Sequence, residues 1–153
     1  MNEQASCPGC NLLSQNNLTL FESNFWKVDL GSNQAYLGRS FVTLKRHIGS
    51  LSLLSAEEWE DLGEVIRRFE LIATKGFGAA CFNWTSLMND TYKQVSPNPH
   101  VHLHVWPRYQ TPPIVNGIIF EDPNFAHHYD KKASRNVEPL VLAAIKTKLS
   151  EKD

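Results

Sequence analysis

The segment that decides the fold reads His100-Val101-His102-Leu103-His104-Val105-Trp106. Side chains alternate between the two faces of a β-strand, so a strand here places three histidines on one face and aliphatic residues on the other. Titratable rings seldom align in this way without a use, and the row takes three of the six histidines in the chain. The pattern therefore predicts a strand with a buried apolar face and a functional imidazole face.

Shorter apolar runs on both sides of this segment predict the remaining secondary structure. Strands are expected at residues 18–21, 25–30, 41–44, 80–84 and 100–106. A helix should begin at Ser55, which can form a capping box with Glu58, and end near Gly76 and Gly78. A C-terminal helix is expected over residues 137–149. Grouped strands with one crossing helix indicate an α+β fold with an antiparallel sheet of about five strands.

Each predicted helix has one apolar stripe that should face the core. In the first helix the stripe comprises Trp59, Leu62, Ile66, Phe69 and Ala73. In the second helix it comprises Leu140, Val141, Ala144, Ile145 and Leu149. Residues from about 109 to 136 lack a clear periodicity, so we expect one domain over residues 1–153 with a less regular tail before its last helix.

Composition excludes several classes of function. The chain has 153 residues, 15 Lys and Arg against 16 Asp and Glu, and a formal net charge of −1. A protein that binds nucleic acid through released counterions needs clustered cations, so no nucleic-acid partner is expected. The chain has neither an apolar run long enough to span a bilayer nor a signal-peptide pattern at its start. We therefore expect a soluble cytoplasmic protein with no membrane partner.

Two chemistries could use the histidine row. Histidines at i and i+2 can bind one catalytic metal ion together with a third ligand. Alternatively, a neutral imidazole can attack phosphorus and form a phosphoramidate that water then cleaves. The spacing alone does not choose between these two mechanisms.

The histidine segment resembles the motif of the histidine triad (HIT) family, in which three histidines alternate with apolar residues. The similarity extends upstream, where residues 38–47 align without gaps with a strand of the family, although Arg39 replaces a histidine and Leu44 a proline. The tail, which includes Phe120-Glu121-Asp122-Pro123-Asn124-Phe125, resembles the diadenosine tetraphosphate hydrolase-like branch. This resemblance implies a HIT-like fold, which commonly forms a two-fold homodimer, and a nucleotide hydrolase that acts through a covalent nucleotidyl-histidine.

The resemblance also implies roles for individual residues. The nucleophile would be His102, and His104 would donate a hydrogen bond at the leaving group. The substrate is expected to be an adenine-containing nucleotide, and the expected contacts to it come from Asp29, Asn89, Ser96 and Asn98. Candidates for contacts to the base are Phe25, Trp26 and Val28, although such residues more often belong to the core.

A second set of residues has the chemistry of a structural zinc site. Cys7 and Cys10 form a Cys-x-x-Cys pair, and the family pattern adds His47 and His100 as ligands. The ion would brace the catalytic strand and would not be required for the chemical step. A redox pair is disfavoured because that motif normally follows a strand and only six residues precede Cys7. A zinc deaminase is disfavoured because its His-x-Glu partner is missing. The third cysteine, Cys81, is expected to be a small buried hydrophobe.

The leading hypothesis is a HIT hydrolase that cleaves an α-phosphate bond of a dinucleoside polyphosphate or a nucleoside phosphoramidate. The first alternative is a metalloenzyme in which the three histidines hold a catalytic ion. The second is a nucleotide-binding module without catalysis, because residues 95–99, before the triad, depart from the family's glycine-containing approach.

Overall fold

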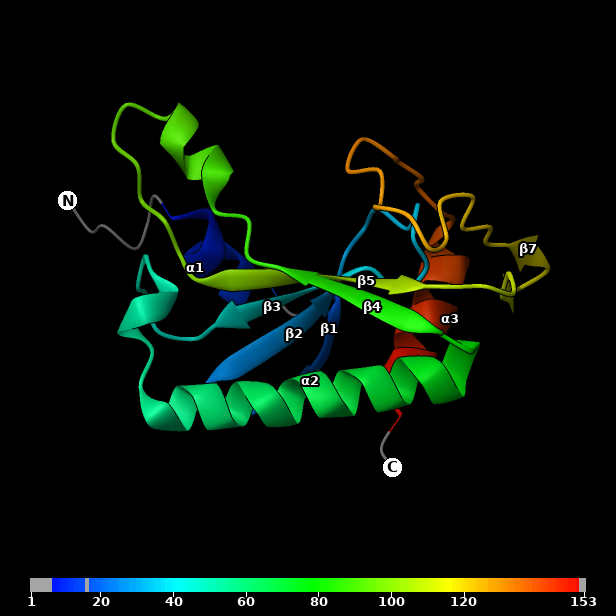
Figure 1. The fold of residues 1–153 in the computed structure, drawn as a ribbon, viewed down its shortest axis with the longest axis horizontal. Helices are drawn as coiled ribbons and strands as arrows, with labels where there is room; N and C mark the ends of the chain where they lie inside the picture. Colours follow the sequence, from blue (N-terminus) through cyan, green and yellow to red (C-terminus); the bar gives the residue numbers. More distant parts are fainter. Residues whose placement is uncertain (1–6, 16, 152–153) are drawn as a thin grey trace.

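The computed structural model describes residues 7–15 and 17–151. An antiparallel sheet with the strand order β1-β2-β3-β5-β4 forms its centre (Figure 1). The five strands are β1 (Thr19–Glu22), β2 (Trp26–Leu30), β3 (Ser40–Leu44), β4 (Cys81–Thr85) and β5 (His102–Arg108). This arrangement confirms the predicted α+β class. The histidine strand β5 begins two residues later than expected, at His102, so His100 lies just before it.

Helix α2 (Ala56–Phe77) connects β3 to β4 and lies along one face of the sheet (Figure 1). The predicted capping box is present, since the Ser55 hydroxyl accepts from the Glu58 amide and the Glu58 carboxylate accepts from the Ser55 amide. The carboxylate of Glu58 is buried and also pairs with Arg46, which joins the chain after β3 to the start of the helix. Gly78 ends α2 with a left-handed φ of 75°.

The main core lies between α2 and the sheet. The buried side of the helix comprises Glu58, Leu62, Val65, Phe69, Ile72 and Ala73. The prediction for Trp59 is wrong, since this side chain is 48% exposed. The buried side of the helix starts at Glu58, one residue before Trp59, and Trp59 therefore points away from the core. Glu58 is polar, but its carboxylate is paired with Arg46.

Helix α3 (Pro139–Leu149) begins two residues later than expected, with Pro139 in its first turn. It buries Val141, Ile145 and Leu149 against α2 and β1. Leu140 was predicted on this side but is 79% exposed, because positions 141, 145 and 149 already form the helix face that meets the core. Cys81 also differs from expectation, since β4 is an edge strand and leaves this thiol exposed.

Several short elements were not predicted. Helix α1 (Pro8–Leu13) begins after Cys7, whose sulfur accepts from the Cys10 amide. The 3₁₀ helices η2 (Leu51–Leu53) and η3 (Asn89–Lys93) interrupt loops, and the tail contains the hairpin β6 (Ile114–Val115) and β7 (Ile118–Ile119). In the part of the chain that the structure describes, no helix has the length and apolar character needed to cross a membrane.

Candidate active site

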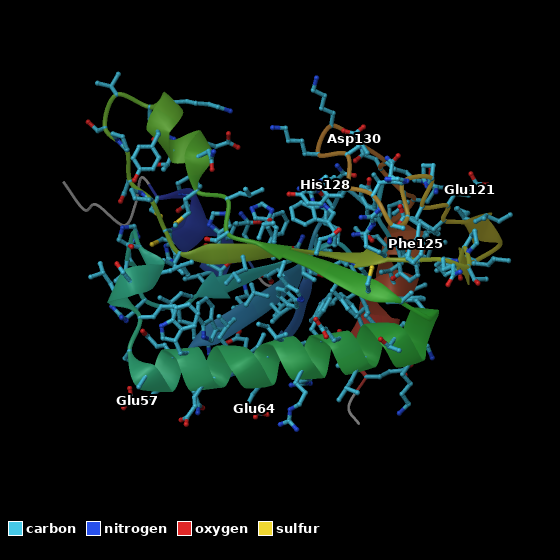
Figure 2. The ribbon with its side chains drawn as sticks, viewed as in Figure 1. Glu57, Glu64, Glu121, Phe125, His128 and Asp130 are labelled. Atoms are coloured by element: carbon cyan, nitrogen blue, oxygen red, sulfur yellow. The ribbon has the colours of Figure 1, made fainter. Side chains whose placement is uncertain are left out.

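A cavity of about 610 Å³ lies on the face of the sheet that carries the histidines. Helix α1, the segment around η3 and the tail border it. Figure 2 shows the tail with His128 and Asp130 on the side of the sheet opposite to Glu57 and Glu64 of α2. One face of the sheet therefore packs the core, and the other is available for chemistry.

His102 is held in one tautomer by its own strand. Its Nδ1 lies 2.7 Å from the carbonyl oxygen of His100, and because a carbonyl can only accept, Nδ1 carries the proton and donates. The neutral ring consequently has its lone pair on Nε2. Since His102 lines the cavity, this arrangement is that of an imidazole prepared for nucleophilic attack.

His104 faces the same nitrogen. The Nε2 atoms of His102 and His104 lie 3.1 Å apart, so His104 donates from Nε2 to the His102 lone pair while no ligand is bound. Burial, the neighbouring His102 and then Arg39 lower the pKa of His104 to about 4. His104 is therefore neutral near pH 7 and acts there as a hydrogen-bond donor.

The sheet register fixes these two rings. Thr43 of β3 pairs with His102, and Phe41 pairs with His104, so both histidines lie on an inner strand. The Phe41 ring contacts His104 edge-on at 4.9 Å between centroids. Ser86 donates to the carbonyl oxygen of His102. Backbone pairing and side-chain contacts together limit the movement of the candidate nucleophile.

Cys7, Cys10, His47 and His100 form a cluster at the start of this strand, with one ligand atom from each within 4.8 Å of the others. Cys10 Sγ lies 3.4 Å from Nδ1 of both His47 and His100, and the two Nδ1 atoms are 3.2 Å apart. A tetrahedral zinc ion requires about 3.6 Å between sulfur and nitrogen ligands and about 3.3 Å between nitrogens. The four residues therefore have the spacing of a Cys₂His₂ site.

The surroundings of the cluster also suit a metal ion. His100 Nε2 lies 2.7 Å from the carbonyl oxygen of Leu44 and donates to it, which leaves Nδ1 unprotonated and free to bind. Burial, together with the hydrogen bond and charge of Cys7, raises the pKa of Cys10 to about 11. Without a cation, this pair would not hold two thiolates near pH 7. The donor set thus fits zinc by its geometry and by its ligand types, two sulfurs and two imidazole nitrogens.

The predicted nucleotide contacts divide into two groups. Asn89 and Asn98 line the cavity. Asp29 and Ser96 do not line it, and Ser96 is exposed to solvent. Asp29 accepts from the hydroxyl of Thr19 at 2.7 Å and lies 3.4 Å from Nζ of Lys27. The base contacts suggested for Trp26 and Val28 are wrong, because both side chains are fully buried in the core. Phe25 packs against the same core.

The structure does not gather the three histidines of the row around one point. His100 turns Nδ1 toward the two cysteines, whereas His102 and His104 face each other farther along the strand. The catalytic ion of the metalloenzyme hypothesis would therefore lack one of its three expected ligands. Sequence reasoning also missed Tyr129 and Lys131, which the tail brings to the cavity, and assigned no contact to Arg39.

The fold is shared with solved histidine triad proteins. A hypothetical histidine triad nucleotide-binding protein from Sulfolobus tokodaii superposes with a TM-score of 0.66 at 16% identity, covering 94% of this chain and 89% of that one. A Zn-bound histidine triad family protein from Mycobacterium smegmatis gives 0.60 at 19% identity, with coverage of 96% and 95%. Diadenosine triphosphate hydrolase from Plasmodium falciparum gives 0.53 at 16% identity, with coverage of 63% and 65%.

No protein-family model matches the chain. No curated protein sequence matches it either. The structural comparisons, all at low sequence identity, therefore identify the histidine triad fold for this chain and confirm the fold expected from the histidine segment.

Proposed function

We propose that the protein is a histidine triad nucleotide hydrolase that cleaves an α-phosphate bond through a covalent intermediate on His102. The observation that carries the proposal is the hydrogen bond from His102 Nδ1 to the carbonyl oxygen of His100. It directs the lone pair of Nε2 into a cavity of about 610 Å³, a size that suits a small-molecule ligand.

In the first step, the lone pair of His102 Nε2 forms a bond to the α-phosphorus, and the bond from phosphorus to the leaving group breaks. The leaving atom takes the electron pair of that bond. His102 becomes an imidazolium, and its Nδ1 proton makes a stronger hydrogen bond to the His100 carbonyl. His104 donates from Nε2 to a phosphate oxygen and keeps its proton. Water then attacks phosphorus, the P–N bond breaks, and a nucleoside monophosphate and a proton are released.

Zinc held by Cys7, Cys10, His47 and His100 would have a structural role. The backbone carbonyl that orients His102 belongs to His100, whose ring is part of the ligand cluster. An ion in the cluster would therefore keep this carbonyl in place. The Zn-bound relative from Mycobacterium smegmatis supports this assignment.

The substrate class and the assembly follow from the resemblance to the family. The hydrolase from Plasmodium falciparum acts on diadenosine triphosphate, which supports an adenine nucleotide as substrate here. Asn89 and Asn98 line the cavity and would contact its phosphates. Asp29 and Ser96 would complete the site after local movement.

We further propose a two-fold homodimer, which sedimentation velocity would detect at about twice the monomer mass.

The test of the mechanism is a His102→Ala variant, with His128→Ala as the matched control because His128 is exposed in the tail. Removal of the nucleophile should lower turnover of diadenosine tetraphosphate by at least about a thousandfold. Zinc content and melting temperature should stay within error of wild type. Rapid acid quenching followed by mass spectrometry should locate an adenylyl group on His102 in the wild-type protein.

Two results would separate the alternatives. Normal turnover by His102→Ala would eliminate the covalent mechanism. Tight binding of adenosine monophosphate by wild type, with neither turnover nor an adduct, would instead identify a nucleotide-binding module without catalysis.

A further inference from the structure

The cavity continues beyond His104 into a part that the mechanism has not used. We call this part the annex and define it by Arg39, Trp106, Tyr129 and Lys131, all of which line the cavity. Two of these residues come from the sheet side and two from the tail. The annex is therefore formed only when the tail is seated on the sheet.

Stacked aromatic rings form one wall of the annex. His104 and Trp106 are nearly parallel, with 5.3 Å between ring centroids and 7° between planes. Tyr129 stacks on Trp106 with a centroid distance of 4.1 Å and an angle of 14°. Trp106 is only 2% exposed, so the middle ring of the stack is enclosed by its neighbours. The wall thus begins at the donor histidine of the proposed reaction and leads away from the nucleophile.

Two cationic side chains, Arg39 and Lys131, also line the annex. The guanidinium carbon of Arg39 lies 5.3 Å from the Trp106 ring centroid and 5.6 Å from that of Phe41, which positions the charge beside His104. In the ranges that the structure describes, Arg39 Nε is buried without a hydrogen-bond partner, and neither Arg39 nor Lys131 forms an ion pair. A buried donor without a partner is costly, and an anionic ligand would satisfy it.

The charges around the annex support the same conclusion. Asp90 of η3 is the carboxylate that interacts with both His104 and Lys131, but it is fully exposed and already pairs with Lys93. Burial lowers the pKa of Arg39, which shows that its charge is poorly solvated. The attraction between an anionic ligand and the buried charge of Arg39 should therefore be stronger than the repulsion between that ligand and the exposed Asp90.

We propose that the annex binds the leaving group of the reaction and that this leaving group is a polyphosphate chain, held by Arg39 and Lys131. The inference rests on the proposed function and narrows it. The substrate would be a nucleotide whose α-phosphate is linked to further phosphates, in preference to a nucleoside phosphoramidate, whose leaving group is uncharged. The bond that breaks is then the α–β phosphoanhydride bond, and the released oxygen remains an anion next to Arg39.

The test compares two substrates that transfer the same adenylyl group. Diadenosine tetraphosphate has an anionic leaving group, whereas adenosine 5′-phosphoramidate releases ammonia. Arg39→Gln should lower kcat/KM for the tetraphosphate by about tenfold to a hundredfold. Lys131→Gln, at an exposed position, should lower it by about threefold. Both variants should change kcat/KM for the phosphoramidate less than about threefold.

Lys132→Gln is the matched control for Lys131, because Lys132 is the next residue, is also exposed and does not line the cavity. Arg39→Lys tests whether charge at this position is sufficient, and it should recover part of the lost activity. Circular dichroism and melting temperature check that each variant is folded.

Calorimetry with inorganic tripolyphosphate tests the annex without catalysis. Wild type should bind the anion, and the double variant Arg39→Gln with Lys131→Gln should bind it at least about tenfold more weakly. Equal affinity in the two proteins, or an equal loss of activity on both substrates, overturns the inference while the hydrolase proposal stands. Anion binding that depends on Arg39, in a wild-type protein that turns over neither substrate, contradicts the hydrolase proposal and leaves the annex as an anion site.

Discussion

At the scale of single residues, His104 is the histidine whose protonation the fold alters most clearly. Its pKa falls from 6.5 to about 4, chiefly through burial. Between pH 4 and pH 6.5, His104 therefore binds a proton in the unfolded chain that it does not bind in the folded protein. Stability supplied by the neutral ring is complete above pH 6.5 and is lost as the pH falls toward 4.

This difference predicts that protonation of His104 removes about 1 to 3 kcal/mol of stability between pH 6.5 and pH 4. The measurement is urea denaturation at several pH values for wild type and for His104→Gln, which cannot titrate. The difference in free energy of unfolding between the two proteins should change with pH by this amount in favour of the variant at low pH. Parallel curves for the two proteins would contradict the assignment.

Sequence reasoning identified residues whose role is visible in a short segment. The alternation of His102 and His104 and the spacing of Cys7 and Cys10 each indicate a chemistry within a few residues, and the structure brings both sets to one strand end. Tyr129 has no such local signal. It reaches the cavity because the tail folds back onto Trp106, and the irregular segment around Tyr129 has no periodicity that predicts this contact.

At the scale of elements, α1 approaches the cluster of two cysteines and two histidines so closely that one position excludes any side chain. A Cβ atom added at Gly9 would lie 2.6 Å from Cγ of His100, which is too short for any contact. Gly9→Ala should therefore push α1 away from the strand and separate Cys7 and Cys10 from His100. We expect a loss of about 1 to 3 kcal/mol in stability and at least about tenfold in zinc affinity.

Gly63→Ala is the control for this substitution. Gly63 lies in the middle of α2, and an added Cβ there would meet no atom within 4 Å. The change should raise stability by about 0.5 to 1 kcal/mol, because alanine favours the helix, and should leave zinc affinity unchanged. Chelator competition and thermal melting of both variants give the comparison. Unchanged zinc affinity in Gly9→Ala would show that α1 does not set the cluster geometry.

Helix α2 shows which parts of the fold could be predicted from the sequence. The capping box at Ser55 and the positive φ at Gly78 fix both ends of α2 locally, so its extent follows from the sequence. The buried face is a tertiary property. Trp59 is apolar but exposed, whereas Glu58 is acidic but buried, because Arg46 pairs with its carboxylate. An apolar pattern cannot indicate a charged core residue whose partner lies on another element.

At the scale of the whole molecule, a buried ion pair joins the tail to the sheet. The side chains of Arg108 at the end of β5 and of Asp122 in the tail are both 2% exposed, with two hydrogen bonds between guanidinium and carboxylate at 2.7 and 2.9 Å. Arg108 also donates to Asn83 of β4 and to the carbonyl oxygens of Asn124 and His127. The segment that carries Tyr129 and Lys131 is thus attached next to β5, and the Tyr36 hydroxyl, which accepts from the Asp130 amide at 2.6 Å, holds the same segment. The shape of the annex therefore depends in part on the pair of Arg108 and Asp122.

Asp122→Asn should therefore cost more than an ordinary carboxylate substitution, since it leaves the buried charge of Arg108 without its counter-ion. We expect a loss of about 2 to 4 kcal/mol in urea denaturation, against less than about 0.5 kcal/mol for Glu64→Gln, whose pair with Arg67 is exposed. Hydrogen exchange should increase in the tail more than in α2, and affinity for tripolyphosphate should fall because Tyr129 and Lys131 leave the annex. If both variants lose the same small amount of stability, the pair does not hold the tail. The hydrogen bond from the Asp130 amide to the Tyr36 hydroxyl and the packing of Tyr129 on Trp106 then position the annex instead.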